Sequence, residues 1–216
     1  MNNLAQSPPP TPPPTPSPSV WPDAPRLVPD AALPASRYLG PPDPHPRRDA
    51  RGSLFGHAAP APGLAADRWR DDRTYLFGID LYHQGYLWEA HEQWEAGFFA
   101  ATAPGHRDLL QALIQLAAAQ IQARRGRGAG VRILAHAVVR RLRSACEPVA
   151  AASSPQAGAT DRTPTPPAPA PRLAGLDPRA LLADVERHFA AALAAGTTDA
   201  DAARTVGPPP RLEVGP

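Results

Sequence analysis

The chain has 216 residues, among them 31 prolines, 22 basic residues, 20 acidic residues and one cysteine, and its formal net charge is +2. So small a charge gives no reason to expect nucleic acid or a membrane surface as a partner, and the single Cys146 excludes an internal disulfide and a multi-cysteine metal cluster. Residues 1–18 lack the charged and apolar regions of a signal peptide, and no stretch has the apolar length of a membrane span. We therefore expect a cytoplasmic protein.

The prolines divide the chain into segments of different character. Only Pro104 lies between Asp71 and Glu147, whereas the other prolines lie toward the two ends and in a stretch after Glu147. Proline-rich segments bury too little apolar surface to offset the loss of chain entropy on folding. We therefore predict a core of four helices at 67–147 and a fifth helix at 173–196, joined by a proline-rich linker at 148–172. The segments 1–66 and 197–216 are predicted to be disordered.

The first three helices are predicted from apolar periodicity. The first begins near Asp67 and ends at Gln84, where Gly85 is typical of a C-cap. The second spans about 86–99. The third spans about 107–124 and is apolar on nearly every side, so we expect it to be the most buried helix.

The last two helices are separated by the predicted linker. The helix at about 131–146 places its arginines and His136 on one side, which we interpret as a solvated face because no aromatic residues interleave to stack bases. The fifth helix follows an Asp177-Pro178 start and ends at Gly196. Its regular apolar stripe needs a covering surface, so we expect it to pack on the first four. The predicted fold is an all-α bundle of about five helices, flanked by disordered proline-rich segments.

The second helix carries the pattern that points to chemistry. A helical projection puts His91 and Glu95 at the centre of its apolar face, with Glu89, Gln93 and Ala96 opposite. Because His91 and Glu95 are four residues apart, their side chains are neighbours and could share a proton, a water or a metal ion. The predicted apolar face comprises Leu87, Trp88, Trp94, Phe98 and Phe99.

A longer pattern surrounds this pair: Gly85, Tyr86, Glu89, Ala90, His91, Glu92 and Glu95, followed in the third helix by Leu113, Ile114 and Gln115. This pattern resembles that of a family of small helical bacterial and archaeal proteins, the domain of unknown function 309. The family pattern is His-x-x-x-Glu-x-x-(Trp/Tyr) within a signature close to Gly-x-Tyr-x-Glu-Ala-His-Glu-x-x-Glu, followed by a Leu-Ile-Gln helix. Phe98 stands where the family has Trp or Tyr. The resemblance covers about 79–142 and 173–185, and implies no established activity beyond a suggested role of the motif in metal binding.

Two classes of function remain open for this pair. In the structural interpretation, which we favour, Glu95 accepts a hydrogen bond from His91, and Gln111 or Gln115 of the third helix satisfies the remaining polar atoms. The protein is then a structural or partner-binding helical module with a protein as its partner.

In the alternative interpretation, His91 and Glu95 are two ligands of a divalent metal ion such as zinc, in a metal-binding protein or a metal-dependent enzyme. A stable site needs three or four ligands. His83 and Glu92 are the nearest candidates for the others, with Trp88 and Phe98 as surrounding residues. Convergence of a third ionisable side chain on the pair would favour this interpretation over the structural one.

Overall fold

The computed structural model describes residues 20–152 and 172–215, so residues 1–19 and most of the predicted linker lie outside the described part. The described residues form helices and no strand, which confirms the predicted all-α class. None of these helices is both long enough and apolar enough to cross a membrane. The elements are η1 (Ala66–Arg68), α1 (Arg73–His83), α2 (Leu87–Ala100), α3 (Pro104–Arg124), α4 (Gly128–Ala152), α5 (Pro178–His188), α6 (Ala190–Leu193) and α7 (Asp199–Ala202).

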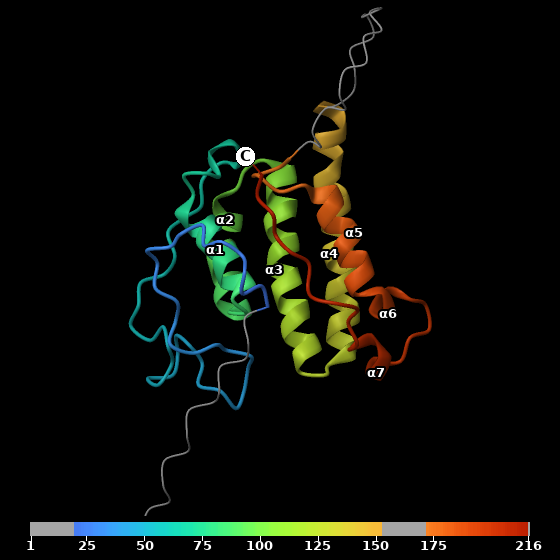
Figure 1. Cartoon of the computed structure of the whole chain (residues 1–216), viewed down its shortest axis with the longest axis horizontal. Helices are drawn as coiled ribbons and strands as arrows, with labels where there is room; N and C mark the ends of the chain where they lie inside the picture. The colour runs from blue at the N-terminus through green and yellow to red at the C-terminus, as the bar shows by residue number, and fades with distance from the viewer. Residues whose placement is uncertain (1–19, 153–171, 216) are drawn as a thin grey trace, which may run out of the picture.

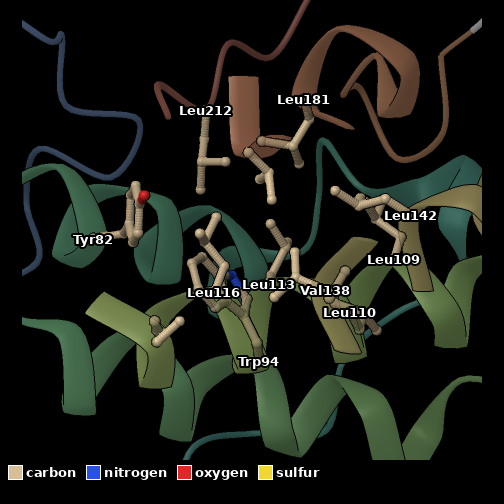
Figure 2. Close-up of a cluster of buried hydrophobic side chains, with 14 of the residues drawn as sticks. Tyr82, Trp94, Leu109, Leu110, Leu113, Leu116, Val138, Leu142, Leu181 and Leu212 are labelled. Atoms are coloured by element: carbon tan, nitrogen blue, oxygen red, sulfur yellow. The ribbon is translucent and has the colours of Figure 1, made fainter. Parts of the chain in front are cut away.

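The five longer helices pack in chain order. Each of α1 to α4 packs against the helix that follows it, and the short α6 and α7 also pack on α4. Figure 1 shows α3 in the middle, with α1 and α2 on one side and α4 and α5 on the other. The prediction that α3 is the central buried helix is confirmed by its fully buried side chains. Figure 2 shows its leucines among Tyr82 of α1, Trp94 of α2, Val138 of α4 and Leu181 of α5.

Local capping explains where the helices begin and end. Asp72 caps α1 by accepting a hydrogen bond from the main-chain N–H of Tyr75 at 2.9 Å, so the helix begins at Arg73 and not near Asp67. Gly85 has φ +81°, the left-handed geometry expected of a C-cap glycine. Pro104 occupies the first turn of α3, where its missing N–H is not needed, so this helix begins earlier than predicted.

The buried face of α2 differs from the predicted one. The buried residues are Leu87, Glu89, Ala90, Trp94 and Gly97, whereas His91 and Glu95 are only partly buried and Phe99 is 73% exposed. Small residues decide this orientation. Gly78 of α1 leaves no room for a Cβ beside the Trp94 indole, and Gly97 lies so close to Gly63 that a Cβ on Gly63 would clash with its main chain. The sequence prediction weighted large apolar side chains and not small residues, so it placed the buried face of α2 on the wrong side of the helix.

Residues 20–66, which we call the N-terminal arm, pack against the helices where the sequence predicts disorder. Three carboxylates on or beside α1 and α2 accept hydrogen bonds from main-chain N–H groups of the arm. Asp80 accepts from Leu27 and Val28 at 2.8 and 2.9 Å, and its carboxylate also pairs with the Arg26 guanidinium. Asp72 and Glu89 accept in the same way from Leu64 and Tyr38. Apolar contacts add to these polar anchors, since Val28 is 3% exposed and Leu27 and Leu33 pack against the core.

The segment after α6 is also packed, in contrast to the predicted disordered tail at 197–216. Figure 1 shows it running from α7 across the bundle. Leu212 is 2% exposed, and its main-chain N–H donates to Nε2 of His83 at 3.1 Å. The main chain of Val206 pairs with that of His188, and its carbonyl lies 3.1 Å from His188 Nδ1. The tail thus closes over the core between α1 and α5.

Candidate metal-binding site

Three metal-ligating side chains converge on one side of α2. His91, Glu92 and Glu95 each offer one ligand atom, and these atoms all lie within 4.8 Å of one another. All three residues are partly buried. The helix itself creates the arrangement, because Glu95 follows His91 by four residues and Glu92 by three, and residues three and four apart are neighbours on a helix. A third ionisable side chain therefore joins the predicted pair, and no second group of this kind occurs in residues 20–152 and 172–215.

His83, the other predicted ligand, is occupied elsewhere. It lies at the end of α1, is 5% exposed, and its Nε2 accepts the hydrogen bond from the main chain of Leu212. Burial, with Arg211 nearby, lowers the pKa of His83 to about 4. The proposal that His83 completes a metal site with His91 is therefore wrong, because its acceptor nitrogen already holds the C-terminal segment.

The glutamines proposed to satisfy the pair lie on another side of α3. Gln122, which shares its side of α3 with Gln111 and Gln115 by helical spacing, lies against Gly130 of α4. Gln115 Oε1 is buried and has no hydrogen-bond partner among the described residues. Within the described residues no hydrogen bond joins His91 to Glu95 or to a glutamine. The observed geometry does not support the hydrogen-bonded network of the structural interpretation.

The aromatic residues assigned to the surroundings of the pair have different positions. Phe98 lies at the end of α2, where the Arg107 guanidinium sits 4.2 Å from its ring centroid and donates to its carbonyl. Trp88 lies one turn before His91 and is covered by the N-terminal arm. The rings of Tyr38 and His45 are 5.7 and 5.2 Å from the Trp88 ring, both edge-on. The arm, and not the bundle, therefore covers this side of α2.

Charge around the group comes from the arm as well as from the helix. Arg47 Nε lies 3.3 Å from Glu92 Oε2, and the two side chains are 22% and 23% exposed. Glu92 and Glu95 carry two negative charges, and Arg47 offsets one of them. The remaining negative charge favours a cation at this place on the helix.

Glu89 is the polar residue that the sequence interpretation misplaced. It was expected opposite the buried face, yet it is 1% exposed, and its Oε1 accepts from the Tyr38 main chain at 3.2 Å while its Oε2 has no hydrogen-bond partner. Burial raises the pKa of Glu89 to about 7. The sequence signal that could have placed it is the pair of small residues Ala90 and Gly97, which lie two turns apart on the buried side of α2.

The donor set suits a borderline divalent ion. One imidazole nitrogen and two carboxylate oxygens are ligands that zinc and similar transition metals accept. Three protein ligands leave at least one coordination position for water or a small ligand. The group can therefore hold an ion without enclosing it.

Comparison with known proteins agrees with the position of this group. Residues 75–134 match the family model described as Domain of unknown function (DUF309). The matched segment runs from α1 into α4 and contains His91, Glu92 and Glu95, whereas the N-terminal arm and the C-terminal segment lie outside it. No curated protein and no solved structure matches the chain.

Proposed function

Residues 75–134 form a domain of the DUF309 family, and from this premise we propose that the chain binds a divalent metal ion, such as zinc, through His91, Glu92 and Glu95. The observation that carries the proposal is the convergence of their three ligand atoms within 4.8 Å. Ligands bound at about 2.1 Å from one ion lie at most about 4.2 Å apart. Small rotations of three partly buried side chains bring the atoms into that range.

The site would keep an open coordination position. Closed structural zinc sites have four protein ligands, whereas sites with three protein ligands and a bound water are typical of catalysis or ligand exchange. The partial exposure of His91, Glu92 and Glu95 agrees with access from solvent. A metal-dependent reaction or the binding of a small ligand would use this position, in a cytoplasmic protein.

Zinc binding to the full chain tests the proposal. Titration calorimetry with Zn²⁺ in a non-chelating buffer is expected to show one ion bound by the wild type. His91→Ala and Glu95→Gln remove a ligand each and are expected to abolish that binding. His136→Ala removes an exposed histidine of α4 and serves as the matched control. A wild type that binds no Zn²⁺, or two ligand variants that bind it like the control, would overturn the proposal.

A partner-binding helical module remains the second candidate function. Large apolar side chains that are exposed favour it: Phe99 at the end of α2 is 73% exposed, and Ile133 on α4 is 70% exposed. Phe99→Ser and Ile133→Ser would reduce association with a partner and leave Zn²⁺ binding unchanged. Unchanged self-association and unchanged co-purification of other proteins in both variants would count against this candidate.

A further inference from the structure

One of the three proposed ligands is already held by a cation of the N-terminal arm. Arg47 Nε lies 3.3 Å from Glu92 Oε2, and each of the two side chains is more than three quarters buried. Screening by water and salt is weaker at such a place than on an open surface. The Arg47 guanidinium therefore repels a divalent ion that is bound to Glu92, and the two cations compete for the same carboxylate.

Arg47 also holds the shape of the arm. Its Nη1 donates to the carbonyls of His57 and Ala58 at 3.2 and 3.3 Å, and its main-chain N–H donates to His45 Nδ1. His45 in turn packs edge-on against Trp88 of α2. A single side chain thus joins the two limbs of an arm loop to each other and to the helix that carries the candidate site.

We propose that Arg47 is a built-in competitor of the metal ion, so that docking of the arm on α2 and binding of the ion oppose each other. In the ion-free chain the guanidinium neutralises Glu92 and keeps the arm over α2. The bound ion takes over that neutralisation, and Arg47 leaves the carboxylate. This inference rests on the metal site of the proposed function and adds a regulation to it.

Thermodynamic linkage makes the competition reciprocal. If docking of Arg47 weakens ion binding by some factor, the ion weakens docking of the arm by the same factor. The main-chain N–H of Tyr38 reports docking directly, since it donates to buried Glu89. Its hydrogen exchange should become faster when the full chain is saturated with Zn²⁺.

Zn²⁺ titration of full-length variants tests the competition. Arg47→Gln is expected to bind Zn²⁺ about tenfold more tightly than the wild type, the scale of removing one like charge near a partly screened ion. Arg48→Gln loses the same charge from an exposed neighbour and serves as the matched control. Arg47→Lys keeps the charge. The Zn²⁺ affinities of Arg48→Gln and Arg47→Lys are expected to stay within about twofold of the wild-type affinity.

The outcomes separate this inference from the metal site itself. If the wild type binds Zn²⁺ and Arg47→Gln binds it equally or more weakly, the competition is wrong and the metal site stands. Equal tightening by Arg48→Gln would overturn it too, because net charge alone would then be the cause. If neither the wild type nor Arg47→Gln binds Zn²⁺, the proposed function fails and the inference fails with it.

Discussion

The N-terminal arm and the helical core are held by different forces. The core is a continuous cluster of apolar side chains from α1 to α5, with Trp94 and Phe189 fully buried. The arm also packs some apolar side chains on the bundle, such as Leu27 and Leu33, but three carboxylates of the helical region, Asp72, Asp80 and Glu89, accept its main-chain N–H groups. The free energy gained by apolar burial is proportional to the buried area and does not depend on any one contact, whereas each buried carboxylate depends on a few specific hydrogen-bond partners. The arm is therefore the part of the molecule that single polar substitutions can release.

The largest effect is expected in the core. Phe189→Ala should lower the free energy of unfolding by about 3–5 kcal/mol, because a fully buried aromatic ring is lost and a cavity remains. Phe189 is 0% exposed. Denaturant unfolding measures the change, with Phe99→Ala at an exposed site as the control. If both variants unfold like the wild type, the Phe189 ring between α5 and α6 does not contribute to the core.

Loss of an arm anchor should come next. Asp80→Ala removes a buried carboxylate and leaves the Arg26 guanidinium and the N–H groups of Leu27 and Val28 without their acceptor. We expect a loss of about 3 kcal/mol, the lower end for breaking a buried charge pair. Hydrogen exchange should accelerate at Leu27 and Val28 while the amides of α3 stay protected. Equal acceleration in α3 would show that arm and core unfold as one unit.

Acid should weaken the contacts of the N-terminal arm and the C-terminal segment with His83 of α1. The His83 carbonyl accepts from Val20 and Trp21, and its ring accepts from Leu212. Burial lowers the pKa of His83 to about 4 in the folded chain, below its usual 6.5. The unfolded state therefore binds more protons between these values, and stability present above pH 6.5 is lost as the pH falls toward 4, by up to about 3 kcal/mol.

The variant His83→Gln separates this contribution from other acid effects. A glutamine oxygen can accept from the Leu212 main chain but does not titrate in this range. Unfolding measured from pH 7 to pH 4 should fall less steeply in the variant than in the wild type. Parallel curves would mean that His83 does not couple the C-terminal segment to pH.

The smallest effect is expected at an exposed contact between the arm and α1. Arg73 pairs with Asp30 at 2.7 Å, but both side chains are at least 60% exposed. Exposed pairs contribute little because solvent and salt screen them. Arg73→Gln should leave the thermal midpoint and the exchange of arm amides unchanged. A loss comparable to that of Asp80→Ala would contradict the distinction between buried anchors and surface pairs.

These two regions also differ in how far the sequence predicts them. Periodicity identifies the five longer helices because their apolar residues repeat at the helical spacing. It misses the arm, whose acceptors are acidic residues that usually face solvent, and it misorients α2, where Ala90 and Gly97 make the contact. Local helical spacing alone is enough to bring the ligand atoms of His91, Glu92 and Glu95 within 4.8 Å of one another. The long-range partners, His83 and Gln115, could not be placed, because their positions depend on packing between helices.

X-ray absorption at the zinc edge of the Zn²⁺-loaded full chain tests the central claim most directly. The account predicts a shell of nitrogen and oxygen ligands at about 2.0–2.2 Å with one imidazole, and loss of the imidazole signal in His91→Ala. His136→Ala should leave the spectrum unchanged. A sulfur ligand at about 2.3 Å, which would implicate Cys146, or an imidazole signal that survives in His91→Ala, would contradict the proposed site.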